Sequence, residues 1–156
     1  MTPALAVAFF TKSSAGTLPV TLTTAEKNLA IHPQISRFVL PICTTINMNG
    51  CATFILVTSL FVMQNSGLAI TPSVMISWVF ISVFTAVGNA GVPMGCYFLT
   101  LSLMSSIGAS VGILGLILPI YTFIDMVETV ENVWSDSVVC TITHKKLSPT
   151  IETSNN

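Results

Sequence analysis

The sequence predicts an all-α integral membrane protein with two transmembrane helices and two helical hairpins that enter the membrane without crossing it. Of its 156 residues, 52% are hydrophobic and 7% are charged, whereas a soluble domain has about 25% charged residues. No Asp, Glu, Lys, Arg or His lies between Arg37 and Asp125. A soluble fold of this size needs charges on its surface, and a lipid-facing one must avoid them. The third observation is that Gly, Ser, Asn and Pro interrupt the apolar segments.

Four apolar segments follow one another along the chain. The segments 35–64 and 109–143 are long enough to cross a membrane, which takes about 20 helical residues. The segments 3–30 and 73–107 are interrupted near their middles, and each half is too short to cross. Non-helical backbone at membrane depth must be buried in protein or line a wet cavity, so these two segments are predicted to be re-entrant hairpins. The polar residues 147–156 are predicted to form a disordered tail.

The order hairpin, crossing, hairpin, crossing suggests an inverted repeat. The two hairpin tips, "SSAGTLP" and "GNAGVP", share Ala-Gly and a nearby Pro. Broken segments at matching places in two halves indicate the binding site of a transporter. Lys27 and Arg37 flank one turn, and Lys145 and Lys146 follow the last crossing. The positive-inside rule therefore predicts a cytoplasmic C-terminus.

Charge and cysteine usage narrow the functional classes further. The net charge of −1 gives no basic surface, so nucleic acid is excluded as an expected partner. The four cysteines, Cys43, Cys51, Cys96 and Cys140, form no C-x-x-C pair and lie among apolar neighbours. They are predicted to be small buried hydrophobic residues rather than disulfides or metal ligands.

The stretch "TTINMNGC", residues 44–51, places two amides and a glycine inside an apolar crossing. A turn is one interpretation, because Asn-Gly is a strong turn dipeptide. A turn would leave two pieces too short to cross, so a helix unwound at 45–50 fits better. Unwinding frees backbone carbonyls, and Thr45, Asn47 and Asn49 add side-chain oxygens. Oxygen cages of this kind suit a hard cation such as Na⁺.

The stretch "DMVETVENVWSD" places polar residues on one face of the last crossing. These are Asp125, Glu128, Thr129, Asn132 and Asp136, and their spacing confines them to roughly one third of the helix circumference. They could form the wet face at the end of an amphipathic helix. Acids within a membrane are costly, however, and usually mark an ion or substrate pathway. Asn132 and Asp136 could contribute to the same cation cage.

The first tip, "KSSAGT", has two equally weighted interpretations. Ser13 and Ser14 offer hydroxyl groups, and free amides near Gly16 could bind a carboxylate. The same residues could simply reverse the chain.

Four motifs together resemble a known family. In chain order they are "TKSSAGTLPV", "TINMNGCA", "GNAGVP" and "DMVETVENVWSD", between residues 5 and 145. Their order resembles the C-terminal transport domain of the dicarboxylate/amino acid:cation symporters, the glutamate-transporter family. The resemblance implies an inverted-repeat transport domain over residues 1–146, located in the inner or plasma membrane in contact with lipid. It also implies no enzymatic activity and no organic cofactor.

The resemblance further implies roles for individual residues. An amino acid or dicarboxylate would be bound by Lys12, Ser13, Ser14, Cys51, Val92, Asp125, Glu128, Thr129 and Asn132. In that set, Asp125 would hold the substrate's ammonium group, and Thr129 and Asn132 would contact its carboxylate side. Sodium, the expected coupling ion, would be bound by Cys43, Thr45, Asn47, Met48, Asn49, Ala86, Val87, Asn89, Asn132 and Asp136.

Three positions depart from the family pattern. Asn49 stands where Asp is usual, which removes charge from one ion site, and Cys51 stands where Thr is common. Glu128 stands where members with acidic substrates have Arg. Arg binds a side-chain carboxylate through two hydrogen bonds, whereas Glu would repel it. A neutral or cationic amino acid is therefore expected as substrate, or else Glu128 couples transport to H⁺.

The resemblance also implies missing parts. Six family helices that precede this region, including the scaffold with its trimer interface, have no counterpart here, and alternating access needs them. The first hypothesis is the substrate- and ion-binding half of a cation-coupled symporter, trimeric when completed by an N-terminal half. The alternative is a non-transporting remnant that inserts in the membrane or associates with full-length relatives. A soluble helical binding protein is the third hypothesis.

Overall fold

The computed structural model describes the backbone of residues 1–154 and the side chains of residues 1–147. Within that range the chain forms seven helices and no strand, so the predicted all-helical class is confirmed. The helices are α1 (Thr2–Thr11), α2 (Ser14–Asn28), α3 (Pro33–Ile46), α4 (Asn49–Asn65), α5 (Pro72–Val87), α6 (Gly95–Ser106) and α7 (Gly112–Ser154).

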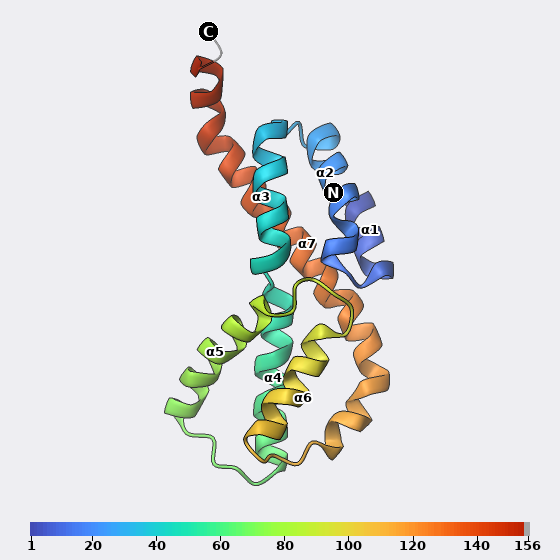
Figure 1. Cartoon of the computed structure of the whole chain (residues 1–156), viewed down its shortest axis with the longest axis vertical. Helices are drawn as coiled ribbons and strands as arrows, with labels where there is room; N and C mark the ends of the chain where they lie inside the picture. Colours follow the sequence, from blue (N-terminus) through green and yellow to red (C-terminus); the bar gives the residue numbers. More distant parts are fainter. Residues whose placement is uncertain (155–156) are drawn as a thin grey trace.

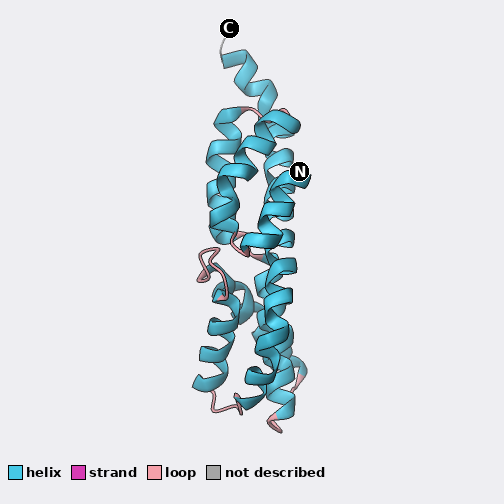
Figure 2. Ribbon diagram, turned by 90° about the vertical axis from the view of Figure 1, so that its right-hand side faces the viewer, coloured by secondary structure: helices cyan, strands magenta, loops and turns pink. Residues whose placement is uncertain are grey.

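The long helix α7 organises the molecule (Figure 1). Helices α3 and α4 follow each other along it, and both contact it. Helices α1 and α2 join α3 at one end of the molecule, whereas α5 and α6 join α4 at the other. The molecule is therefore elongated (Figure 2). Its two helix groups meet at mid-length, where α3 gives way to α4 (Figure 1).

Two stretches are long and apolar enough to cross a membrane. They are Pro33–Asn65, which comprises α3 and α4, with a mean hydropathy of 1.6, and Gly112–Leu147 of α7, with a mean hydropathy of 1.7. Both overlap the predicted crossings 35–64 and 109–143. Pro33 opens α3 at its first turn, where a missing backbone N–H costs nothing.

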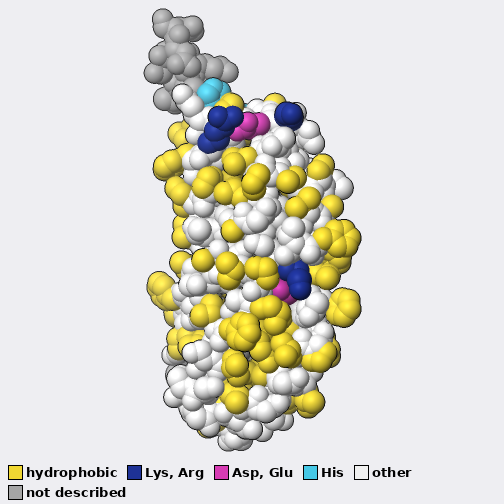
Figure 3. Space-filling view, turned by 45° about the vertical axis from the view of Figure 1, so that its right-hand side comes forward, with side chains coloured by type: hydrophobic (Ala, Val, Ile, Leu, Met, Phe, Trp, Pro, Cys, Tyr) yellow, Lys and Arg dark blue, Asp and Glu magenta, His cyan; other side chains and the backbone are white. Residues whose placement is uncertain are grey.

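The outer surface is unusually apolar for a protein of this size. Phe10, Phe84 and Leu116 are each 76% exposed, and hydrophobic side chains cover much of the face seen in Figure 3. Contiguous apolar surface on this scale marks contact with another apolar phase. Together with the two long apolar helices, it supports a location in the membrane.

Each predicted hairpin contains two helices. In the first, α1 packs on α2, and the turn between them passes through Lys12, whose φ is 54°. The hydroxyl of Ser13 then accepts a hydrogen bond from the Gly16 N–H at 3.0 Å, which caps α2. In the second, residues 88–94 join α5 to α6, and both helices pack mainly on α4. How deeply these hairpins enter a membrane stays a prediction.

The chain end differs from the sequence-based expectation. Helix α7 continues through Ser154, whereas a disordered tail was predicted from residue 147. Once a helix is nucleated, each added residue gains one backbone hydrogen bond, so a long preceding helix favours extension. Residues 155 and 156 of the predicted tail lie outside the described residues.

An ion pair links α2 to the start of α3. The Glu26 carboxylate accepts hydrogen bonds from Arg37 Nε at 2.9 Å, from Arg37 Nη2 at 3.2 Å and from Ser36 Oγ at 2.9 Å. The Arg37 hydrogen bond, followed by that of Ser36, lowers the pKa of Glu26 below its ordinary value. A lowered folded-state pKa means that the stabilisation is present above the unfolded-state pKa and is lost as the pH falls through the folded-state value.

We expect Glu26→Gln to lower the Tm slightly at neutral pH, because exposed ion pairs contribute little. The difference from the unmodified chain should vanish as the pH is lowered through the range in which Glu26 protonates. Thermal unfolding in detergent, followed by circular dichroism, measures both. Lys27→Gln, which alters an exposed neighbouring charge, is the control. A Tm difference that persists in acid would contradict this account of the ion pair.

Candidate functional site

The site is built around the interruption between α3 and α4. Helix α3 ends at Ile46 and α4 begins at Asn49, and Asn47 and Met48 between them have φ/ψ of −95°/62° and −98°/63°, outside the helical region. This two-residue break lies inside the segment 45–50 that was predicted to be unwound. A helix start exposes backbone N–H groups that lack helical partners, and those at membrane depth need substitutes.

One side chain of α7 supplies such a partner for a backbone N–H, and a second side chain binds the side chain of Asn47 at the break. Asn132 Oδ1 accepts a hydrogen bond from the Gly50 N–H at 2.9 Å. Asn47 Nδ2 donates to Asp136 Oδ1, also at 2.9 Å. Asn132 and Asp136 are both buried. Two members of the predicted polar stripe therefore face the break and hold its two sides against α7.

Close approach of α4 to α7 depends on Gly50. A Cβ at this position would lie 2.7 Å from Glu131 Oε2 and 2.8 Å from the Cα and carbonyl oxygen of Glu128. Real Cβ atoms do not approach other atoms so closely, and part of the obstruction is backbone that cannot rotate away. The absence of a side chain at Gly50 therefore permits the contact between the two helices.

The two hairpin tips meet beside the break. The Gly91 carbonyl oxygen accepts hydrogen bonds from Ser13 Oγ at 2.8 Å and from the Ala15 N–H at 3.3 Å. A Cβ on Gly91 would lie 3.1 Å from both the Ala15 nitrogen and the Thr44 carbonyl oxygen, and the φ of Gly91 is 68°. The first tip, the second tip and the end of α3 thus converge at one glycine.

The second tip also contacts the acidic part of α7. The Met94 N–H donates to Asp125 Oδ2 at 3.2 Å. The Tyr121 hydroxyl lies 3.4 Å from Asp125 Oδ1 and 3.5 Å from Glu128 Oε2. A phenol has one proton and can donate to only one of these acids at a time. Glu128 Oε1 has no hydrogen-bond partner among the described residues.

The structure distributes the predicted site residues unevenly. Those buried are Ser14, Cys43, Met48, Cys51, Ala86, Asn89, Asp125, Glu128, Thr129, Asn132 and Asp136; those partly buried are Lys12, Ser13 and Asn47; those exposed are Thr45, Asn49, Val87 and Val92. The Thr129 hydroxyl donates to the Asp125 carbonyl within α7 at 2.7 Å. The Thr45 hydroxyl likewise donates to the Ile42 carbonyl at 2.8 Å. Both hydroxyls keep acceptor capacity but no free proton.

The donor set near the break fits a hard cation. The Cys43 carbonyl oxygen, which would be one donor, already accepts from the Asn47 N–H at 2.8 Å. At the second tip, Asn89 is buried and its Oδ1 has no partner among the described residues. Unsatisfied buried acceptors are costly, and a cation held with backbone carbonyls would satisfy this one. Carboxylate, amide and carbonyl oxygens are ligands suited to Na⁺.

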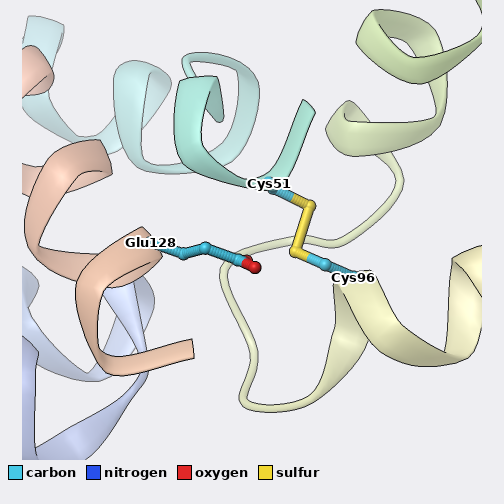
Figure 4. Close-up of side chains that lie close together, drawn as sticks. All are labelled: Cys51, Cys96 and Glu128. Carbon is cyan, nitrogen blue, oxygen red and sulfur yellow. A yellow bond between two sulfur atoms is a disulfide. The ribbon is translucent and has the colours of Figure 1, made fainter. Parts of the chain in front are cut away.

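The cysteine prediction is wrong for one pair. Cys51 and Cys96 form a disulfide, with their Cα atoms 5.6 Å apart (Figure 4), inside the usual range for such bonds. They are 45 residues apart in sequence, and their proximity arises because α4 and α6 begin side by side below the second tip. Sequence spacing alone does not reveal that proximity. Cys43 and Cys140 are free and buried, as predicted.

Two side chains of the site were missed in the sequence. Ser135 Oγ accepts hydrogen bonds from Asn47 Nδ2 at 2.9 Å and from Asn49 Nδ2 at 2.6 Å. It adjoins Asp136 but lies off the stripe, so helical spacing does not single it out. Tyr121, in contrast, precedes Asp125 by four residues, and the i, i+4 rule for helix neighbours could have identified it.

Comparison with known proteins identifies relatives among transporters. The model of the sodium:dicarboxylate symporter family matches residues 1–146. Neutral amino acid transporter A of Bos taurus is 35% identical over 144 residues, which cover 92% of this chain and 27% of the relative. Excitatory amino acid transporter 2 of Homo sapiens is 33% identical over 127 residues, 81% of this chain and 22% of the relative. The chain therefore spans about a quarter of the length of these curated relatives.

The close packing at Gly50 yields a testable prediction. Gly50→Ala should lower the free energy of unfolding by about 1–3 kcal/mol, the usual cost of overpacking. Gly115→Ala in α7 is the control, because nothing lies within 4 Å of its added methyl group; it should be neutral or stabilising, since Ala favours helix. Unfolding in mixed detergent micelles measures both. Equal stability of the two variants would show that α4 and α7 are not in contact at Gly50.

Proposed function

We propose, because the chain belongs to the sodium:dicarboxylate symporter family, that it is the substrate- and cation-binding part of a sodium-coupled amino acid symporter. This family and the relatives named above are transporters rather than enzymes. The observation that carries the proposal is the convergence at mid-length: both hairpin tips, the α3–α4 break and the polar stripe of α7 are in mutual contact.

Substrate would bind where the second tip meets α7. The Met94 N–H at present donates its hydrogen bond to Asp125 Oδ2. A substrate ammonium group on Asp125 would replace the tip's hydrogen bond, so binding and movement of the second tip would be coupled. The tip-to-tip hydrogen bond between Ser13 and Gly91 at 2.8 Å would open to admit the substrate.

Sodium would bind at the break and at the second tip. The first site would use Asp136 with Asn47, Asn132 and the Cys43 carbonyl. The second would use the unpartnered Asn89 Oδ1 together with backbone carbonyls of the tip. The proposed ion ligands come from α7, from the break and from the second tip. Bound ions would therefore fix the positions of these three segments, which also contact the substrate.

A neutral or cationic amino acid is the proposed substrate class. Glu128 is buried, and its carboxylate and that of Asp125 both lie within reach of the Tyr121 hydroxyl. Two carboxylates at this position would repel a third on the substrate. The named relatives include a neutral and an excitatory amino acid transporter at similar identity, so the proposal rests on Glu128.

Transport itself would require the remaining three quarters of a relative's length, in the same polypeptide or in a separate one. Rocking of the binding part against a scaffold gives alternating access, and the scaffold would also form a trimer. Lys27, Arg37, Lys145 and Lys146 would place the C-terminus in the cytoplasm.

Uptake of labelled amino acids with and without a sodium gradient tests the proposal. Cells would produce the chain alone, or together with the N-terminal part of a relative. Sodium-driven uptake that requires both parts would support the proposal. Absence of uptake in both cases, with the chain present in the membrane, would favour the non-transporting remnant.

The Asp136 carboxylate is expected to carry sodium dependence. In an active assembly, Asp136→Asn should raise the sodium concentration for half-maximal uptake by about tenfold or more, because an interaction with a charged group is worth about 1.5–3 kcal/mol. Glu131→Gln is the control: it removes another carboxylate of α7, outside the proposed ion site, and should leave the sodium concentration for half-maximal uptake unchanged. Unaltered sodium dependence in Asp136→Asn would exclude the proposed cage.

Glu128 is expected to set substrate charge preference. Glu128→Arg should shift uptake toward acidic amino acids, since Arg offers a carboxylate two parallel hydrogen bonds. Glu131→Arg introduces the same charge three residues further along α7 and serves as control. Competition of labelled neutral substrate by aspartate or glutamate measures the shift. Unchanged selectivity in Glu128→Arg would refute this role.

A further inference from the structure

The disulfide lies against an acidic side chain. Cys51 is in the first turn of α4, Cys96 is in the first turn of α6, and Glu128 reaches toward both from α7 (Figure 4). One carboxylate oxygen and the two sulfur atoms lie within 4.8 Å of one another, and all three residues are buried. Three helices thus bring two sulfurs and a carboxylate to one point.

A second, independent observation is the unpartnered oxygen of Glu128. Glu128 is 6% exposed, its Oε1 has no hydrogen-bond partner among the described residues, and its Oε2 has only the distant Tyr121 hydroxyl. The only ion pair within the described residues joins Glu26 and Arg37, so no basic side chain neutralises Glu128. A buried carboxylate oxygen left in this way is costly unless some cation or donor satisfies it.

We propose that reduction of the disulfide turns Cys51, Cys96 and Glu128 into a binding site for one thiophilic divalent cation, such as Zn²⁺ or Cd²⁺. Two thiolates and one carboxylate are a ligand set that such ions accept, with a fourth position left for water or a solute. Two sulfurs on one tetrahedral zinc lie roughly 3.8 Å apart, so the cysteine side chains need only small rotations. This inference concerns metal binding and does not depend on transport.

The chemistry balances with a phosphine as reductant. The phosphine takes the oxygen of a water molecule and becomes a phosphine oxide, the sulfur–sulfur bond breaks, and the two hydrogens of that water end on Cys51 and Cys96 as thiols. When the cation binds, both thiol protons pass to the solvent. In the oxidised chain the two sulfurs stay bonded to each other, so neither Cys51 nor Cys96 offers a thiolate.

The surroundings suit a metal ligand on Cys96. Asn89 Nδ2 donates to Cys96 Sγ at 3.3 Å. Hydrogen bonds from outer groups orient metal ligands and tune them, and this one would stabilise a thiolate on Cys96. Asn89 belongs to the second tip, whose Met94 N–H contacts Asp125. A bound cation would consequently join α4, α6 and α7 immediately below the tip.

Cadmium binding to the purified full chain in detergent tests the proposal, with Cd²⁺ alone as the probe. Near-ultraviolet absorption of the thiolate–cadmium bond reports coordination, and equilibrium dialysis gives the stoichiometry. We expect one Cd²⁺ per phosphine-reduced chain and none bound through sulfur before reduction. This comparison needs no variant, so misfolding of a mutant cannot obscure it.

Variants then assign the ligands. Cys51→Ser and Cys96→Ser should abolish the absorption band, and Glu128→Gln should weaken Cd²⁺ binding by roughly tenfold or more. The double change Cys43→Ser with Cys140→Ser removes the two free buried cysteines and should leave the band intact. Circular dichroism confirms that each variant keeps its helices.

Three results would overturn the proposal. They are the absence of the band in the reduced chain, an equal band before and after reduction, and loss of the band in the Cys43 and Cys140 double variant. Because no uptake is measured, failure of the proposed transport function would leave each of these results interpretable.

Discussion

The structure depends on hydrogen bonds that side chains of α7 accept from an interrupted helix. A break at Asn47 and Met48 leaves backbone groups at the start of α4 without helical partners, and such groups are costly where they are buried away from water. The Asn132 side chain accepts a hydrogen bond from the Gly50 N–H, and the Asp136 carboxylate accepts one from the side-chain amide of Asn47. The bond to the Gly50 N–H also needs the close approach of α4 to α7 that the absence of a side chain at Gly50 permits.

The polar centre and the apolar exterior are two parts of the same arrangement. Large hydrophobic side chains such as Phe84 and Leu116 face outward, while acids such as Asp125 and Asp136 are inside. This inverts the usual distribution in a soluble domain. Polar groups are costly at membrane depth, and they persist where they serve an ion or a substrate. The convergence of both tips on this polar centre is the reason that we propose it as the ligand-binding site.

Local patterns in the sequence predicted much of this arrangement. Asn and Gly inside an apolar run predicted the interruption of the crossing, and helical spacing placed Asp125, Asn132 and Asp136 on one face. Both features follow from short-range chemistry and helix geometry. The helical class and the family resemblance followed from the same stretches and from their order.

Features that arise from three-dimensional packing were not predictable in the same way. The disulfide between Cys51 and Cys96 joins residues brought together by the return of the chain through the second tip. The tip-to-tip bond between Ser13 and Gly91 joins segments separated by 78 residues. Ser135 entered the site through its proximity to the break, not through the stripe. Such contacts depend on where whole helices lie, and a single sequence carries no signal that pairs the residues which make them.

The most direct test of the central claim is the melting temperature of the purified chain in sodium chloride compared with choline chloride. A ligand that binds only the folded state raises the free energy of unfolding by RT ln(1 + [L]/Kd), and the Tm rises with it. If the break and the polar stripe of α7 form a sodium site, the Tm should rise with sodium concentration and stay constant with choline. Identical melting curves in the two salts, up to high concentration, would contradict the assignment of this polar centre as a cation site.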